Sequence, residues 1–186
     1  MFSVREVIEA TQAVTAMRDE RVTAFSAVVT DTRKIEPGAL FIALKGERFN
    51  GEDFAADAVA AGAAGVLLSD ACPSEKYAGI EGADVLLVPD TLAAYQQLAH
   101  AWRERFTLPV VAITGSNGKT TTKDLTAAVL SARGPVLKTQ ANFNNEIGLP
   151  LTLLGLRKKH TAAVVEIGMR DFHQIEALAP VADPSI

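Results

Sequence analysis

The chain has 186 residues, of which 48% are hydrophobic and 22% charged, and its formal net charge is −4. This length accommodates one large domain or two small ones, each with its own core, and the composition excludes a disordered chain. The acidic balance argues against a broad nucleic-acid-binding face, which requires a basic surface.

The single cysteine, Cys72, excludes an internal disulfide and a zinc site built from several cysteines. The first residues lack a basic segment followed by an apolar one, and no apolar run approaches roughly 18 residues, the length of a membrane span. We therefore expect a soluble cytoplasmic protein with no signal peptide and no membrane insertion.

The first half alternates strand-like and helix-like segments. Short apolar runs bounded by glycine or proline predict buried strands at 40–44, 65–69 and 85–88. Between the first two runs, 53–61 is predicted to be helical, with Asp53 as its N-cap and Gly62 ending it.

A longer helix capped by Asp90 or Thr91 is predicted, because apolar residues recur at helical spacing from Leu92 to Phe106. We place the domain boundary near residue 90, which gives a first domain at 1–90 and a second at 91–186; the helix either links the two domains or opens the second.

The second half begins with a predicted strand at 110–114, followed by a glycine-rich turn, a helix over about 120–133 and another strand at 161–167. Strand, glycine loop, helix and strand in this order are typical of a parallel α/β fold. The predicted fold class is therefore α/β throughout.

The glycine-rich turn has the composition of a phosphate-binding loop. Its glycines let successive backbone N–H groups point inward, and the following helix adds free N–H groups and the positive end of its dipole. Lys119 supplies a cation for the β- and γ-phosphates, and the Thr120 hydroxyl is suited to ligating Mg²⁺. The predicted nucleotide-binding residues are Gly115, Ser116, Asn117, Gly118, Lys119, Thr120 and Thr121.

The usual phosphate loop has four residues between its glycines, whereas here the first glycine stands closer, at Gly115, so the loop is a shorter variant. The alternative is a chance glycine turn before a helix. The Gly-Lys-Thr-Thr run and both flanking elements favour the phosphate loop.

Glu166 ends the apolar run 162–165 of the predicted strand at 161–167 and is followed closely by Gly168. Ligands of open parallel sheets lie beyond the carboxyl ends of the strands, so a carboxylate there can reach a Mg²⁺ ion held at the neighbouring strand end. Thr120 and Glu166 are the predicted metal ligands. The alternative for Glu166 is a solvated acid at a strand end.

An asparagine-rich segment, 139–150, lies between these two features. Asparagines favour turns, so a plain loop is one interpretation. The other is that the amides of Asn142 and Asn144 hydrogen-bond a phosphate or the water shell of a metal, and these two residues join Lys119 and Glu166 as the predicted catalytic set.

Three segments together resemble the Mur ligases, the cytoplasmic enzymes that build the peptidoglycan stem peptide. The segment 113–121, Ile-Thr-Gly-Ser-Asn-Gly-Lys-Thr-Thr, resembles their ATP loop, which related synthetases share. The segments 142–154 and 165–170 are similar to the branch that performs the last cytoplasmic step.

The first half resembles the UDP-sugar-binding domain of this family. The resemblance rests on Asp-Thr-Arg-Lys at 31–34, Pro-Gly-Ala-Leu-Phe-Ile-Ala-Leu-Lys-Gly at 37–46 and Asn-Gly-Glu-Asp-Phe at 50–54. It implies these substrate-binding residues: Asp31, Thr32, Arg33, Lys45, Gly46 and Asn50. Arg33 offers a planar fork suited to a diphosphate; the alternative is a structural turn with a surface arginine.

The resemblance implies ATP and Mg²⁺ as cofactors and a two-step reaction. The terminal carboxylate of UDP-N-acetylmuramoyl-tripeptide takes the γ-phosphate of ATP, and the amine of D-alanyl-D-alanine then displaces phosphate from the acyl phosphate. Positioning and charge neutralisation are the tasks of the protein.

Relatives in this family are more than twice as long and have three domains, so we expect this chain to hold the first domain and the start of the second. The chain alone is expected to be inactive as a ligase, and the complete enzyme to be a monomer. A smaller departure is His173-Gln174-Ile175, where relatives often read Gly-Glu-Ile.

Three alternatives remain at this point. The first half taken alone could equally belong to the ligase of the preceding step. The phosphate loop could serve a nucleotide-dependent switch or kinase, although the UDP-sugar-domain pattern upstream argues against this. The chain could also be a non-catalytic binding module.

Overall fold

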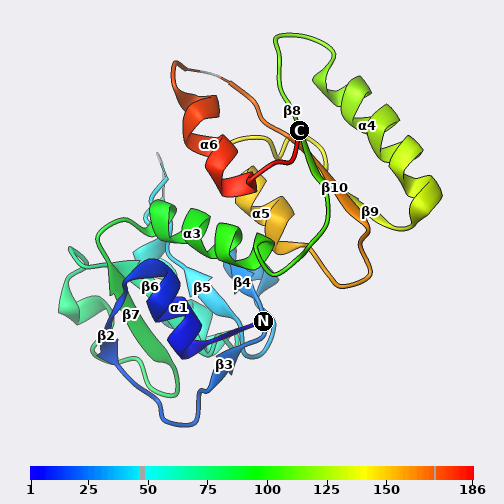
Figure 1. The fold of residues 1–186 in the computed structure, drawn as a ribbon. Coiled ribbons are helices and arrows are strands. Elements are labelled where there is room, and N and C mark those ends of the chain that lie inside the picture. The colour runs from blue at the N-terminus through cyan, green and yellow to red at the C-terminus, as the bar shows by residue number, and fades with distance from the viewer. Residues whose placement is uncertain (47–48, 170) are drawn as a thin grey trace. The chain divides into compact units, whose positions relative to one another are not determined.

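The computed structural model describes residues 1–46, 49–169 and 171–186. The described chain divides into two compact units, Met1–Tyr95 and Gln96–Ile186. The helix α3, Thr91–Arg103, contains the division, whereas the sequence placed the domain boundary near residue 90. Each unit is an α/β structure with its own mainly or wholly parallel sheet, so the predicted fold class is confirmed (Figure 1).

The larger sheet of the first unit has the strand order β2-β7-β6-β5-β4. Its strands β4, β5, β6 and β7 run parallel, and β2 pairs with β7 in the antiparallel direction. The bounds are Val14–Met17 for β2, Val28–Val29 for β4, Leu40–Ile42 for β5, Gly65–Ser69 for β6 and Asp84–Val88 for β7. A small antiparallel pair joins β1, Phe2–Ser3, to β3, Ala24–Phe25.

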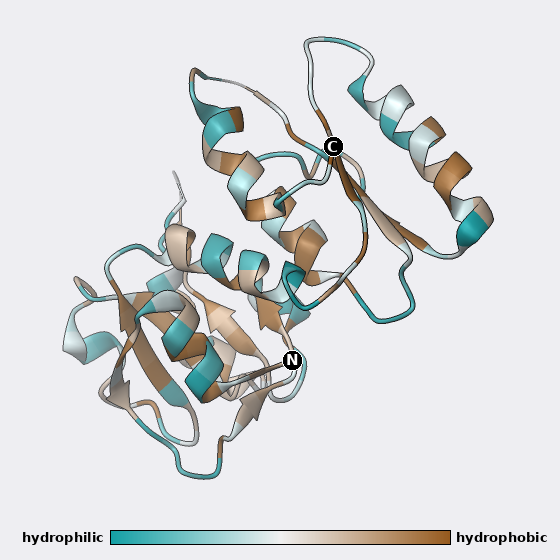
Figure 2. Ribbon diagram, viewed as in Figure 1, coloured by the Kyte–Doolittle hydropathy of each residue, from teal (hydrophilic) through white to brown (hydrophobic). Residues whose placement is uncertain are grey.

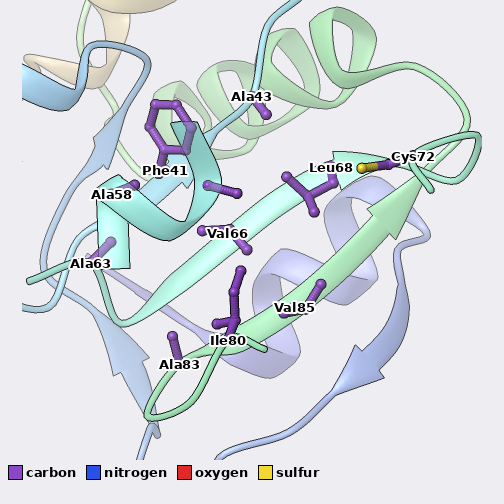
Figure 3. Packing of buried hydrophobic residues seen from close by; sticks show 11 residues of the cluster. Phe41, Ala43, Ala58, Ala63, Val66, Leu68, Cys72, Ile80, Ala83 and Val85 are labelled. Carbon is purple, nitrogen blue, oxygen red and sulfur yellow. The ribbon is translucent and has the colours of Figure 1, made fainter. Parts of the chain in front are cut away.

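The helices of the first unit close the two faces of this sheet. The helix α1, Val4–Thr11, begins with a capping box in which Ser3 and Glu6 bond each other's backbone N–H groups. The helix α2, Ala55–Ala60, lies on the opposite face to α1 (Figure 3). Short 3₁₀ turns occupy Thr32–Lys34, Gly51–Phe54 and Ser74–Lys76.

A buried hydrophobic cluster joins α2 to β5, β6 and β7 (Figure 3). Phe41, Val66, Leu68 and Val85 come from the strands, and Ala58 comes from the helix. Strands covered on both faces require continuous apolar runs, which is the pattern that predicted them. The carboxyl ends of β4 to β7 meet at one edge of the sheet, and this places the loops that follow them together.

The second unit has a parallel sheet with the strand order β8-β10-β9. The strands are β8, Val110–Ile113, β9, Val136–Lys138, and β10, Ala162–Glu166. The helix α4, Lys119–Leu130, packs on one face, and α5, Gly148–Leu154, and α6, Gln174–Ala182, pack on the other (Figure 1). A 3₁₀ turn at Ser131–Arg133 extends α4. Figure 2 shows β10 as a hydrophobic strand between helices of mixed colour.

The end of the chain is attached to the same sheet. The Ser185 N–H donates to the Val110 carbonyl at 2.8 Å, and the Ala112 N–H donates to the Ile186 carbonyl at 2.9 Å. The buried Arg103 donates to the carbonyls of Ala182 and Asp183 at 3.0 and 2.9 Å, where α6 ends. These bonds satisfy carbonyls that the last turn of a helix leaves without partners.

None of the described helices is long and apolar enough to cross a lipid bilayer.

Candidate functional site

The loop between β8 and α4 has the backbone shape that a phosphate loop requires. Gly115 has a φ of 132° and Gly118 has a φ of 77°, in the region that favours glycine. Gly118 also stands as the N-cap of α4, without a side chain over the first N–H groups of the helix. These N–H groups therefore remain available to an anion.

Lys119 is the first residue of α4, and its side chain folds back over the loop. Its Nζ donates to the Gly115 carbonyl at 2.6 Å. An ammonium has three donors, so a phosphate can be bound without loss of this bond.

Glu166 ends β10 and lies beside the start of this loop, because its register partner on β8 is Ile113. Its side chain is almost completely buried, with 4% exposed. Thr120 Oγ1 donates to Glu166 Oε2 at 3.1 Å, and Asn144 Nδ2 donates to Glu166 Oε1 at 2.9 Å. The Thr120 hydroxyl thus donates a hydrogen bond to the carboxylate, and its oxygen lone pairs remain available to another ligand.

Gly168 lets Asn144 reach Glu166. The Gly168 N–H donates to the Asn144 carbonyl at 2.7 Å, and a Cβ on Gly168 would lie 3.0 Å from the Asn144 amide group. A side chain at this position would press against the amide that contacts Glu166.

Two residues that the sequence did not single out also hold Glu166. The Glu166 N–H donates to the hydroxyl of the buried Thr139 at 2.9 Å. The buried Lys123, on α4, has its Nζ 3.8 Å from Glu166 Oε2. The available signal for Lys123 was its place four residues after Lys119, on the same face of the helix.

The loop, the asparagine segment and Glu166 line a common pocket of ≈ 430 Å³. The structure thereby brings together most of the predicted nucleotide, metal and catalytic residues. The lining residues are Ser116, Asn117, Gly118, Lys119, Thr120, Thr121, Ala141, Asn142, Asn144 and Glu166. A second pocket of ≈ 230 Å³ shares Lys119, Asn142 and Asn144 with the first.

The asparagine segment contains both residues with a structural role in the loop and residues that face the pocket. Asn145 has a local structural role, because its Oδ1 accepts the Gly148 N–H at 2.8 Å where α5 begins. Asn142 and Asn144, in contrast, face the pocket with the loop.

The donor atoms of this pocket fit a magnesium ion. Mg²⁺ prefers oxygen ligands and is usually held by one or two carboxylates together with phosphates and water. The Thr120 hydroxyl and the Glu166 carboxylate are oxygen donors 3.1 Å apart, and both border the space in front of the loop.

In the first unit, Asp31, Thr32 and Arg33 form the turn that follows β4. Asp31 caps the turn by accepting the Arg33 N–H at 3.1 Å. Its carboxylate also pairs with the exposed Arg33 guanidinium at 2.9 Å. The hydrogen bonds and charge of Arg33 lower the pKa of Asp31 to about 2.

The other predicted substrate residues lie beside a pocket of ≈ 330 Å³ at the carboxyl ends of β5, β6 and β7. Lys45 and Asn50 pair as an isolated antiparallel bridge, and the Gly46 N–H donates to the Phe49 carbonyl at 2.9 Å. The pocket is lined by Ala43, Lys45, Asn50, Glu52, Ser69, Ala71, Pro89, Asp90 and Thr91. Asp31, Thr32 and Arg33 follow a strand of the same edge but do not line this pocket.

His173 stands where relatives often have glycine, and the backbone at this position has a conformation that favours glycine. His173 precedes α6 with a φ of 64°, a left-handed conformation that glycine adopts without strain. Arg170, in the segment 165–170 that supported the resemblance, lies outside the described residues.

A glycine loop between a parallel strand and a helix, with a carboxylate at the end of the adjacent strand, is the architecture of P-loop nucleotide-binding proteins. Two family models match the chain: "Mur ligase family, catalytic domain" over residues 24–103 and "Mur ligase middle domain" over residues 113–186. The chain belongs to the Mur ligase family, and the resemblance stated above is confirmed.

Two of the most similar relatives bear the same name. The UDP-N-acetylmuramoyl-tripeptide–D-alanyl-D-alanine ligase of Synechocystis sp. is 51% identical over 159 residues, 86% of this chain and 34% of the relative. The ligase of the same name from Bacillus subtilis is 44% identical over 182 residues, 98% of this chain and 39% of the relative.

Solved structures agree with these relatives. MurF from Acinetobacter baumannii has a TM-score of 0.87 and 35% identity, and the match covers 98% of this chain and 39% of that one. MurF ligase from Thermotoga maritima in complex with ADP has a TM-score of 0.74 and 31% identity, over 85% of this chain and 35% of that one. The chain thus spans between 34% and 39% of the length of these four relatives.

Proposed function

We propose that the full-length protein is an ATP-dependent ligase that joins D-alanyl-D-alanine to UDP-N-acetylmuramoyl-tripeptide during peptidoglycan precursor synthesis. The observation that carries this proposal is the shared pocket of the phosphate loop, Asn144 and Glu166, in a chain whose relatives bear the name of this ligase. The enzyme acts as a monomer in the cytoplasm and uses ATP and Mg²⁺.

The two predicted domains divide the substrates between them. Residues 91–186 begin the ATP-binding domain, because they contain the phosphate loop and the sheet that supports it. Residues 1–90 bind the UDP-sugar at the carboxyl edge of their sheet, where ligands of open parallel sheets lie. Lys45 and Asn50 border the pocket at this edge, and Arg33 stands on the turn after β4.

The reaction replaces a poor leaving group by a good one. An oxygen of the tripeptide carboxylate bonds to the γ-phosphorus of ATP as the bond from this phosphorus to ADP breaks. The D-alanyl-D-alanine amine then attacks the carbonyl carbon, inorganic phosphate leaves with the electron pair of the C–O bond, and the amine loses a proton. When bound, Mg²⁺ would neutralise charge on the phosphate oxygens.

The residues of this chain bind and orient the triphosphate. The N–H groups of the loop and the Lys119 ammonium contact the phosphates and offset the negative charge that develops on them. Thr120 and Glu166 would hold the metal, and Asn144 keeps the Glu166 carboxylate in place through its bond at 2.9 Å. Asn142 borders the same pocket and is placed to donate to a phosphate oxygen.

Substrate dependence tests this proposal. Phosphate release by the full-length protein is expected to require UDP-N-acetylmuramoyl-tripeptide and D-alanyl-D-alanine together with ATP. Turnover with the dipeptide-stage precursor and either meso-diaminopimelate or lysine would assign the protein to the preceding step instead. Phosphate release from ATP that requires neither a UDP-linked peptide nor an amine substrate would contradict the ligase assignment altogether.

Residues 1–186 alone are expected to show no ligase activity. Acyl transfer requires exclusion of water around the acyl phosphate. These residues span no more than 39% of the length of the four relatives named above, so they lack most of the chain that could close over the site. The measurement is phosphate release by purified residues 1–186 with all three substrates, next to titration with a UDP-sugar. Three-substrate turnover would refute this expectation.

A further inference from the structure

Lys123 is a buried lysine that the nucleotide pocket does not use directly. It lies on α4, one turn after Lys119, with 4% of its side chain exposed. Its Nζ is 3.8 Å from Oε2 of Glu166, whose side chain is equally buried. The residues that line the pocket include Thr120 and Glu166 but not Lys123.

Packing alone gives no reason for a lysine at this position. Lys123 and Ala127 share the buried face of α4, which lies against β9 and β10. A helix face of this kind normally carries apolar side chains. Burial of an ammonium is costly unless a partner of opposite charge compensates it, and Glu166 is this partner.

We propose that Lys123 is the positioning residue for Glu166, and that it holds the carboxylate ready for a divalent cation in the nucleotide pocket. The inference rests on the proposed function, because it assigns Lys123 a task within the same site. Lys123 acts through Glu166 and does not contact the nucleotide.

The contacts of Glu166 explain how such positioning works. A carboxylate has about four sites for donors, and here Asn144 bonds Oε1 while Thr120 bonds Oε2. Both of these donors border the pocket, whereas Lys123 does not. The ammonium therefore attracts Oε2 from outside the pocket and compensates the buried carboxylate, and the remaining lone pairs stay available to a cation.

Removal of the ammonium is expected to weaken the response to magnesium and not the binding of the nucleotide itself. In Lys123→Met the side-chain length is nearly kept, but among the described residues Oε2 retains only the Thr120 hydroxyl as a partner. The carboxylate then leaves its position, while the loop N–H groups and Lys119 still bind the phosphates.

The experiment measures the affinity of the full-length protein for ADP by calorimetry, with and without Mg²⁺. For the wild type we expect Mg²⁺ to increase the affinity. For Lys123→Met we expect this increase to fall about tenfold, while the metal-free affinity stays within about twofold, as loss of one charge partner implies. Lys158→Met, the same change at an exposed turn, is the matched control and is expected to behave as the wild type.

Two further variants separate positioning from general damage. Glu166→Gln is expected to abolish most of the magnesium effect, and its addition to Lys123→Met is expected to change little more. Lys123→Arg keeps a cation and is expected to retain more of the magnesium effect than Lys123→Met. Thermal unfolding without ligand is expected to show that Glu166→Gln restores part of the stability that Lys123→Met loses.

The outcomes distinguish this inference from the proposed function. If the wild type gains no ADP affinity from Mg²⁺, the proposed nucleotide and metal site is wrong. If the wild type gains affinity and Lys123→Met gains as much, only the role of Lys123 is wrong. The same conclusion follows if Lys123→Arg and Lys123→Met lose the effect equally, or if the effects of Lys123→Met and Glu166→Gln simply add.

Discussion

The hydroxyl of Thr139 is expected to stabilise the second unit and to fix the backbone at Glu166. Thr139 follows β9 and is 1% exposed. Its N–H donates to the Val164 carbonyl at 3.1 Å, and its hydroxyl accepts the Glu166 N–H at 2.9 Å. The side chain thus continues the pairing of β9 with β10 by one step, and valine has the shape to replace it without the bond.

The magnitude follows from the burial of both partners. In Thr139→Val the Glu166 N–H loses its acceptor where little water can reach it, and a buried unsatisfied donor costs about 1–3 kcal/mol. We therefore expect a loss of about 2 kcal/mol in the free energy of unfolding, since valine packs about as well as threonine here. In a cooperative unit of about 60–100 residues, this corresponds to a decrease of roughly 10 °C in Tm.

Thermal unfolding by circular dichroism measures the decrease, and hydrogen exchange at the Glu166 amide reports the broken bond itself. Thr139→Ser keeps the hydroxyl and is expected to retain most of the stability. Thr107→Val, at an exposed loop position, is the control for the change in chemistry. The reasoning is refuted if Thr139→Val unfolds at the wild-type temperature, or if Thr139→Ser is destabilised as much as Thr139→Val.

Three further predictions concern single residues. Lys119→Ala is expected to abolish phosphate release by the full-length protein and to leave its circular dichroism unchanged, since the Lys119 ammonium bonds the carbonyl of its own loop; near-normal turnover of a folded variant would contradict this. Arg33→Ala is expected to raise the pKa of Asp31 from about 2 toward the ordinary aspartate range, and Lys34→Ala to raise it less, as followed by NMR titration of the carboxyl carbon. Because this pKa is lowered in the folded state, the stabilisation is present at neutral pH and is lost on acidification toward about pH 2; an unchanged Asp31 titration in Arg33→Ala would exclude the pair. His173→Gly is expected to raise the free energy of unfolding by up to about 1 kcal/mol, with His173→Asn between the two, because a φ of 64° strains histidine; a lower Tm for the glycine variant would be the opposite result.

Several elements with clear periodicity were predicted well from the sequence. The structure has β6 at Gly65–Ser69, as predicted, and α3 begins at Thr91. The helix predicted over about 120–133 is observed as α4 with the 3₁₀ turn that follows it. Buried parallel strands and amphipathic helices have local hydrophobic patterns that a sequence displays directly.

Several of the elements that were not predicted depend on tertiary packing. The strands β1, β3 and β4 have two residues each, too few for any pattern. The helix α5 begins inside the segment that one interpretation treated as a plain loop, and its Pro150 stands in the first turn, where the missing N–H has no helical partner anyway. Glycine and proline near a helix start are therefore weak arguments against the helix.

The site shows a second limit, since its contacts join residues far apart in the chain. The sequence indicated that Glu166 ends a strand and that Thr120 opens a helix. These residues meet across 46 positions because β10 lies next to β8, although β9 comes between them in the chain. Strand order of this kind is a property of the sheet and has no local signature in the sequence.

Thr139 and Lys123 belong to the site although they lie outside its recognisable sequence motif. From sequence alone, a threonine after a strand and a lysine in a helix are expected to lie at the surface. Both are buried here against Glu166. For Lys123 the neighbouring pattern is a further signal, because it stands four residues before the buried Ala127, on the same face of α4. A polar residue on a face that packing requires to be apolar therefore indicates a buried partner, and at the end of a parallel strand this partner is a candidate functional group.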